Sequence, residues 1–270
     1  MNHMHMTGVV TGANGGIGSA VARQLAKAGH VIIAQHHPRF TAQAEELQAE
    51  LRTNGTEVLL VSADFLEHDG VQQFTSEVTG IMEDRSDLRL KVLVNTAALL
   101  AGPSHDSATA EQFDAFFNVN VRAPFFICQA LAPLMPTGGS IVNVSSAAAH
   151  FSTPDDIVYA MGKAAIEQMT RQLAEPYAKR GVRVNAVIPG FTNNGMQAFD
   201  DPDFMAYMSS FAILGGVAAP HEIAEAICFL ASDRASRTTG SMLDATGGSI
   251  LGVRGVPEEA LGDRLAGLVD

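Results

Sequence analysis

Residues 11–18 read Thr11-Gly12-Ala13-Asn14-Gly15-Gly16-Ile17-Gly18, and this stretch decides the fold class of the chain. An apolar run at 6–10 precedes it and a helix-forming pattern at 17–27 follows it. Glycines between a strand and a helix permit a tight turn, and they let a pyrophosphate approach the helix N-terminus closely. The stretch therefore predicts a phosphate-binding turn, and the alternative is a glycine-rich turn that binds no ligand.

Strand and helix patterns alternate along the rest of the chain. The expected strands cover residues 6–10, 31–34, 57–61, 91–95, 140–144, 183–188 and 241–245. The expected helices cover residues 17–27, 42–52, 71–82, 110–134, 157–179 and 220–230. This alternation predicts an α/β fold, a single doubly wound, mostly parallel seven-stranded sheet with helices on both faces (Rossmann-like). We expect one domain over residues 1–270, with a substrate lid at about 191–219 and a C-terminal extension at about 252–270.

The composition argues against several classes of partner. The formal net charge is −12 and the pI about 5.1, so bulk charge does not favour nucleic acid or an anionic membrane. No apolar run approaches the roughly 20 residues of a membrane span, and the first residues lack a signal-peptide pattern. Cys128 and Cys228 lie in apolar runs and are expected to be buried free thiols, which fits the cytoplasm. No spacing typical of metal ligands appears.

A phenol and an ammonium stand four residues apart, at Tyr159 and Lys163. A helix places them on one face, one turn apart. The ammonium is expected to stabilise the phenolate and to lower a pKa that is ordinarily about 10. Ser145 and Ser146 follow the expected strand 140–144, and ligands bind at the carboxyl ends of strands in open α/β sheets. These residues form a candidate acid–base centre, and the alternative is two surface residues of an amphipathic helix.

These motifs together resemble the short-chain dehydrogenase/reductase family over residues 7–251. The matching positions are Thr11, Gly12, Gly16 and Gly18, the adenine-contacting acid Asp64, the strand end Asn95-Thr96-Ala97-Ala98, and Pro189-Gly190 with Thr192 and Asn194. The chain departs from the family pattern at Thr96, Ala98, Asn194 and Thr246. The resemblance implies a dinucleotide site formed by Gly12, Asn14, Gly15, Gly16, Ile17, Gly18, His36, His37, Arg39, Asp64, Phe65, Asn95, Ala97, Tyr159, Lys163, Pro189, Gly190, Thr192 and Asn194.

The resemblance also assigns catalytic roles. Ser146, 13 residues before Tyr159, matches the serine that hydrogen-bonds the carbonyl oxygen, whereas Ser145 is one position off. Tyr159 is then the proton donor or acceptor, and Lys163 binds the nicotinamide ribose and tunes the phenol. Asn120 matches the asparagine that holds a relay water, with Asn118 as the competing choice.

The end of the second expected strand bears on the choice of cofactor. An acid there would bind the ribose 2′-hydroxyl of NAD and repel a 2′-phosphate. This chain has His36, His37 and Arg39 there, and a partly protonated histidine pair with an arginine can receive a phosphate. NADP(H) is therefore favoured, and NAD(H) stays possible because Asn14-Gly15 stands where some NADP-type members carry a basic residue.

The resemblance implies an oxidoreductase that reduces a ketone or aldehyde of a small or medium metabolite, or runs the reverse reaction. The lid, with Phe151, His150 and residues 99–107, is expected to enclose the substrate. Family members usually pair the helices at 110–134 and 157–179 between subunits, so a homodimer or homotetramer is expected. The alternatives are a non-catalytic NAD(P)-binding sensor or scaffold, and an isomerase or dehydratase without net redox change.

Overall fold

A computed structural model describes residues 4–195 and 197–251 of the chain. Its centre is a seven-stranded sheet in the order β3-β2-β1-β4-β5-β6-β7, with every neighbouring pair parallel. The strands are β1 (His5–Thr11), β2 (Val31–His36), β3 (Val58–Ser62), β4 (Leu88–Asn95), β5 (Ser140–Val144), β6 (Arg183–Pro189) and β7 (Met242–Ala245). The predicted doubly wound sheet is confirmed. The strand order reverses between β1 and β4, which is where such folds bind their ligands.

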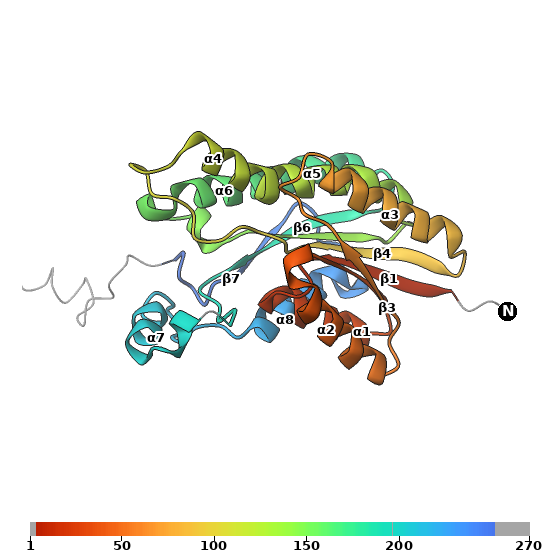
Figure 1. Ribbon diagram of the computed structural model, residues 1–270, viewed down its shortest axis with the longest axis horizontal. Coiled ribbons are helices and arrows are strands. Elements are labelled where there is room, and N and C mark those ends of the chain that lie inside the picture. The colour runs from red at the N-terminus through yellow and green to blue at the C-terminus, as the bar shows by residue number, and fades with distance from the viewer. Residues whose placement is uncertain (1–3, 196, 252–270) are drawn as a thin grey trace, which may run out of the picture.

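Helices cover both faces of the sheet (Figure 1). One layer holds α1 (Gly16–Lys27), α2 (Thr41–Thr53) and α8 (Pro220–Ala231), and the other holds α3 (Gly70–Asp84), α4 (Ala110–Phe117), α5 (Ala123–Leu131) and α6 (Ile157–Ala178). Each layer packs its own apolar cluster against the sheet, so β5, an interior strand, is buried along its whole length. The short helix α7 (Pro202–Ser209) stands apart, beyond the carboxyl ends of the strands.

The segment 110–134 is not the single helix that the sequence predicts. It divides into α4, a π-helical stretch at Asn118–Arg122, α5, and a 3₁₀ turn at Ala132–Leu134. Pro124 lacks an N–H group and so cannot continue the regular hydrogen-bond ladder, and the N–H of Ala123 instead donates to Asn118 O, five residues back. The break places Asn120 inside the π-helical turn.

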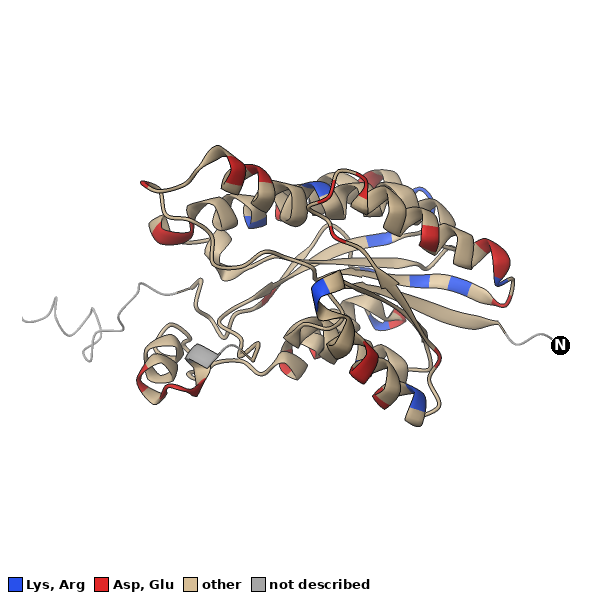
Figure 2. Ribbon diagram, in the orientation of Figure 1, with Lys and Arg blue, Asp and Glu red and all other residues tan. Residues whose placement is uncertain are grey.

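Acidic side chains are spread over helices of both layers rather than gathered in one patch (Figure 2). Among the described residues, no helix is long and apolar enough to cross a membrane. The predicted C-terminal extension, 252–270, lies outside the described residues, and so does position 196 within the predicted lid.

Candidate active site

A cavity of about 770 Å³ opens at the carboxyl ends of the strands, between the glycine-rich turn and the segment around α7. Most of the predicted site residues line it: Gly12, Asn14, Gly15, Gly16, Ile17, Gly18, His37, Arg39, Asp64, Phe65, Ala97, Ser146, Tyr159, Lys163, Pro189, Gly190, Thr192 and Asn194. His36, Asn95 and Asn120 do not line it. One cavity therefore joins the predicted phosphate-binding turn to the predicted acid–base centre.

The glycine-rich turn leaves no room for side chains where the backbone crosses itself. Gly12 has φ +61°, and a Cβ there would lie 2.9 Å from Ala97 Cα. A Cβ on Gly18 would overlap Gly12 O. The N-cap residue of α1 is Gly15, which has no side chain to cap the helix, and the residues of the first turn line the cavity. The first N–H groups of a helix have no intrahelical acceptor. Free N–H donors at the positive end of a helix, beside glycines that admit close approach, suit a pyrophosphate.

Gln35, which the sequence analysis did not single out, fixes this turn. Its Oε1 accepts from Gly12 N at 2.8 Å, and its Nε2 donates to Ala63 O at 2.9 Å. The side chain is buried and also borders the cavity. A polar residue near the end of an otherwise apolar buried strand is the signal that could have identified it, because buried polar groups require partners.

The three basic residues predicted to bind a phosphate, His36 at the end of β2 and His37 and Arg39 after it, differ in their access to the cavity. His36 is 3% exposed, its Nδ1 contacts His37 O at 3.1 Å, and it does not line the cavity. His37 accepts from Arg39 N at Nδ1 (3.0 Å), so its proton sits on Nε2 and is donated to Asp64 Oδ2, also at 3.0 Å. Both histidines are thus committed to protein partners. Arg39 lines the cavity, is exposed, and has no carboxylate partner among the described residues. The cation available to a phosphate is therefore Arg39.

The strand-end motif owes its shape to hydrogen bonds across β1, β4 and β5. Thr11 Oγ1 accepts from the N–H groups of Thr96 and Ala97, each at 3.1 Å, and the Thr96 hydroxyl bonds to Thr11 O. Asn95 is buried and donates to Asn143 Oδ1 at 2.8 Å, away from the cavity. The threonine at position 96 thus has a structural partner of its own, and Asn95 joins β4 to β5, while its predicted contact with the cofactor stays a prediction.

Tyr159, Ser146 and Lys163 meet where β5 ends and α6 begins. Ser146 hydrogen-bonds the Tyr159 phenol and accepts from Ala148 N at 3.2 Å. Lys163 donates to Val144 O at 2.9 Å, and its Nζ lies 5.5 Å from the centre of the Tyr159 ring. Ser146, rather than Ser145, is the serine at the phenol.

The pKa values of this pair differ from the sequence-based expectation. Burial raises the pKa of Tyr159 to about 12. The hydrogen bond from Ser146 lowers this pKa, and the negative charge of Asp156 raises it further. Burial also lowers the pKa of Lys163 to about 8. The ammonium points to a backbone carbonyl and is itself disfavoured by burial, so it does not hold the phenol pKa down. The phenol is accordingly protonated at neutral pH, the state that a proton donor requires.

Asn120 holds the wall of the cavity. Its Oδ1 accepts from Leu99 N at 2.8 Å and its Nδ2 donates to Leu99 O at 3.0 Å. Leu99, Leu100 and Ala101 all line the cavity. The side chain is 2% exposed, so in this structure Asn120 positions the 99–101 segment, and its predicted role as a relay-water ligand stays a prediction.

A buried carboxylate lies one turn beyond Lys163 on α6. Glu167 Oε1 accepts from Ser145 Oγ at 2.7 Å and contacts His150 Nε2 at 2.8 Å. The Ser145 hydroxyl thus donates to Glu167 although Ser145 borders the cavity, and His150, which contacts the same carboxylate, does not border it. Within the described residues, no group of three or more His, Cys, Asp or Glu is placed to hold a metal ion.

The remaining part of the cavity is mostly apolar. Phe151 and four residues of the predicted lid line it, namely Phe191, Phe199, Phe204 and Met208. Two polar residues, Thr153 and Asp156, also line the cavity, and the charge of Asp156 acts on Tyr159. This part of the cavity can hold an apolar ring system beside the phenol.

Comparisons with known proteins agree with this geometry. The family model described as enoyl-(acyl carrier protein) reductase matches residues 12–249. A hydroxynaphthalene reductase-like protein, Arp2 of Metarhizium brunneum, is 30% identical over 256 residues, covering 90% of this chain and 94% of its own. The crystal structure of the angucycline C-6 ketoreductase LanV with bound NADP matches with a TM-score of 0.86 at 34% identity, covering 93% of this chain and 100% of that one. The reductase LugOII, described as catalysing keto-reduction at C1, matches with a TM-score of 0.87 at 33% identity and the same coverage.

Proposed function

Because the chain belongs to the short-chain dehydrogenase/reductase family, we propose that it is an NADP(H)-dependent ketoreductase that acts on an aromatic small-molecule ketone. The observation that carries this proposal is the single cavity that Tyr159, Ser146 and Lys163 share with the glycine-rich turn. A nicotinamide cofactor held by that turn would supply the hydride. The phenol stands ready as the proton source for the carbonyl oxygen.

Each member of the centre has a chemical task that its surroundings support. Tyr159 gives its proton to the substrate oxygen, and Ser146, which already bonds the phenol, donates to the same oxygen as negative charge develops there. Lys163 is oriented by Val144 O toward the Tyr159 ring, where its remaining N–H donors can bind a cofactor ribose. Lys163 is buried and Tyr159 is largely shielded from solvent, and a hydrogen bond to developing charge is stronger in such a low-dielectric setting than in water.

NADP(H) is the favoured cofactor, and NAD(H) is the less favoured one. Arg39 lies just after β2, where a ribose 2′-phosphate would lie, and it is exposed and has no carboxylate partner among the described residues. LanV, the similar ketoreductase, was crystallised with NADP. The 2′-phosphate would be recognised by Arg39 rather than by the histidine pair, since both ring nitrogens of His37 already have protein partners.

Arg39→Ala is expected to raise the Kd for NADPH by about 10- to 100-fold, because a hydrogen bond to a charged group contributes about 1.5–3 kcal/mol. NADH lacks the phosphate, so its Kd should stay unchanged. The two values come from fluorescence titrations of the purified wild type and variant with each cofactor. Oxidation of NADPH with 1-tetralone and with ethyl acetoacetate, measured in the same preparations, tests the ketoreductase assignment.

Arg237→Ala is the matched control, because Arg237 is exposed and does not border the cavity. Equal losses for NADPH and NADH in Arg39→Ala would contradict the role of Arg39. NADPH binding by the wild type without turnover of either ketone would favour the non-catalytic sensor. Product formation without net NADPH oxidation would favour the isomerase or dehydratase.

The substrate side of the cavity supports an aromatic ketone. Phe151, Phe191, Phe199 and Phe204 present rings or ring edges to a ligand, and aromatic side chains favour stacked or edge-to-face contacts with other rings. We further propose that residues 1–270 act as one domain with 191–219 as its lid, because α7 carries Phe204 and Met208 to the cavity from outside the sheet. The free, largely buried thiols of Cys128 and Cys228 support a cytoplasmic location.

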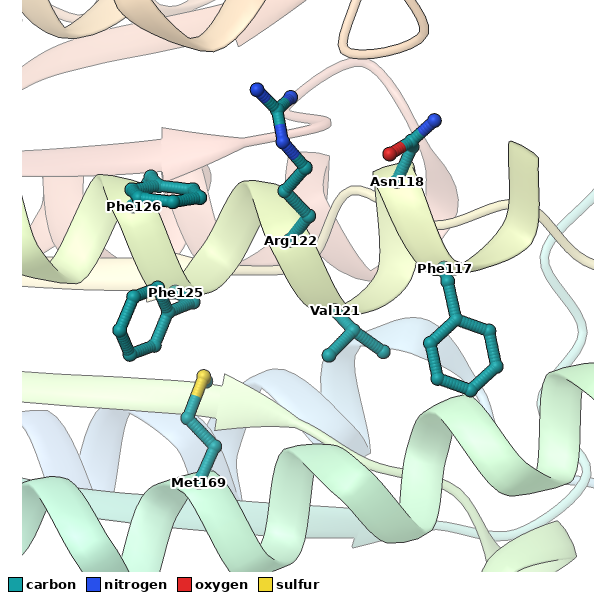
Figure 3. Close-up of a pocket in the computed structure, with 7 residues that line it drawn as sticks. All are labelled: Phe117, Asn118, Val121, Arg122, Phe125, Phe126 and Met169. Carbon is teal, nitrogen blue, oxygen red and sulfur yellow. The ribbon is translucent and has the colours of Figure 1, made fainter. Parts of the chain in front are cut away.

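A homo-oligomer is proposed through the outer face of α4, α5 and α6. A groove of about 330 Å³ lies there, and Figure 3 shows Phe117, Val121 and Phe125 turned toward Met169 of α6 across it. Phe125 is 38% exposed and Phe126 41%, an apolar surface that a second copy of the chain can cover. This apolar surface supports the predicted dimer or tetramer, in which the segments 110–134 and 157–179 pair between subunits.

Phe125→Glu is expected to convert the oligomer to a monomer, since a carboxylate buried at a subunit interface without a partner costs several kcal/mol. Size-exclusion chromatography with light scattering measures the mass. Leu214→Glu places the same charge on another exposed apolar residue, 86% accessible, and should leave the mass unchanged. A wild type that elutes as a 28.5 kDa monomer would contradict the proposal.

A further inference from the structure

Two polar side chains interrupt the apolar part of the cavity next to the phenol. Thr153 precedes a 3₁₀ turn, Pro154–Asp156, that leads directly into α6, and Asp156 is the last residue of this turn. Thr153, Asp156 and Tyr159 all line the cavity. Burial raises the pKa of Tyr159, and the charge of Asp156 lies close enough to the phenol to raise it further.

Asp156 is held by one of its two carboxylate oxygens. Its Oδ1 accepts from Gly102 N at 2.6 Å, and a Cβ on Gly102 would come as close to that oxygen as the nitrogen does. The side chain does not cap α6, although Asp156 is the residue before the helix. Among the described residues no donor reaches Oδ2. The carboxylate is thus fixed in direction, with one acceptor oxygen unused.

Thr153 has an unused hydroxyl. Its Oγ1 is fully buried and has no hydrogen-bond partner among the described residues. The backbone around it is ordered, because Thr153 O accepts from Asp156 N at 3.0 Å. A buried hydroxyl without a partner is destabilising, and in native proteins such a group commonly awaits a ligand or a water molecule.

The charge of the pair decides which ligand group it can take. A carboxylate accepts hydrogen bonds and repels other anions. Burial raises the pKa of Asp156 above its ordinary value, which shows that negative charge is already disfavoured at this position, so a second anion beside it would be unfavourable. A hydroxyl on the substrate can donate to the carboxylate and accept from the threonine. A methoxy group offers no donor, and a carboxylate or phosphate adds charge of the same sign.

We propose that Thr153 and Asp156 bind a hydroxyl group of the substrate, so that the enzyme selects hydroxylated aromatic ketones over their methoxy or unsubstituted counterparts. This rests on the proposed ketoreductase function, because it concerns the same cavity. The hydroxyl-binding pair lies outside the acid–base centre and would determine which ketones the enzyme prefers. The phenylalanine side chains of the cavity would contact the ring system, and residues 153–156 would bind its hydroxyl group.

The test uses 1-tetralone with its 5-, 6- and 7-hydroxy derivatives and the three matching methoxy compounds. For each ketone, kcat/KM is measured by NADPH oxidation and Kd by quenching of enzyme-bound NADPH fluorescence. At least one hydroxy isomer should exceed its methoxy partner by about 10-fold or more in both quantities, the factor expected for a hydrogen bond to a charged group. Asp156→Asn keeps an acceptor for Gly102 N but presents an amide donor to the substrate, and it should reduce this ratio toward one.

Three further variants make the result specific. Thr153→Val removes only the hydroxyl and should lower the hydroxy-to-methoxy ratio, whereas Thr153→Ser should restore it. Asp155→Asn is the matched control, because Asp155 is exposed on the same turn and does not border the cavity. Its ratio should equal that of the wild type.

The outcomes separate this inference from the proposed function. Reduction of the tetralones with no preference for any hydroxy isomer would overturn the inference and leave the ketoreductase function standing. Preferential binding of a hydroxy isomer, lost in Asp156→Asn, but without reduction would support the inference and refute the function on these ketones. Equal losses for hydroxy and methoxy compounds in Asp156→Asn would show that the carboxylate only anchors Gly102, and failure to bind any of the ketones would overturn the inference as well.

Discussion

Tyr159→Phe is expected to lower kcat for ketone reduction by about 10²- to 10⁴-fold, the usual contribution of a positioned proton donor. The ring and its packing remain, while the hydroxyl that Ser146 bonds is lost. The glycine-rich turn is built from other segments, so NADPH affinity should survive. Steady-state NADPH oxidation measures the first quantity and a fluorescence titration of the same preparation measures the second.

The chain provides a matched control on the same helix. Tyr177 also has a pKa that burial raises to about 12, but it packs against the apolar cluster beneath α6 and does not border the cavity. Tyr177→Phe therefore makes the same chemical change in a similar environment, and turnover should persist. If Tyr159→Phe turned over as fast as Tyr177→Phe, the proton donor would have to be sought elsewhere in the cavity.

The fold could be predicted from the sequence because its signals are local. Each buried strand is an apolar run, and each crossover helix separates two of them, so alternation alone dictates a parallel sheet. The prediction was wrong where a local rule competes with a longer pattern. Residues 110–134 have helical composition throughout, yet Pro124 removes one donor and the chain passes through a π-helical turn.

The candidate site could be predicted only at positions where the residue type and its spacing in the sequence are enough to indicate a chemical role. Tyr159 and Lys163 fall on one helical face by spacing, and the structure places them in the cavity. The side-chain direction of His36 and Asn95 could not be predicted, because each ends a strand and the pleat turns it into protein rather than toward the cavity. Asn120 depends on contacts with Leu99, 21 residues away.

Other participants have no sequence signal because their partners are distant in the chain. Gln35 meets Gly12 across two strands, and Asp156 meets Gly102 across a segment of 54 residues. In the sequence Glu167 looks like any acidic residue of a helix, and only the structure shows its contacts with Ser145 and His150. The pKa of Tyr159 shows the same limit: the sequence places a cation nearby, but burial, a property of the whole fold, has the larger effect.

The glycine-rich turn permits a second prediction with a large effect. A methyl group in Gly18→Ala would overlap Gly12 O and stand 3.0 Å from Thr96 Oγ1. Neither neighbour can yield freely, because Gln35 fixes Gly12 N and Thr11 bonds Thr96. Overpacking of this kind costs about 1–3 kcal/mol, which corresponds to a loss of about 5- to 150-fold in NADPH affinity where the strain falls on the binding turn.

Gly80→Ala separates that strain from the general effect of adding a methyl group to a helical glycine. Gly80 lies inside α3 and nothing stands within 4 Å of an added Cβ, so this variant should be more stable by about 0.5–1 kcal/mol and should bind NADPH as the wild type does. Thermal unfolding and NADPH titration of both variants give the comparison. Unchanged NADPH affinity in a folded Gly18→Ala would mean that the glycine-rich turn can move without losing its ligand. Cofactor binding would then not depend on the close contact between Gly12 and Gly18.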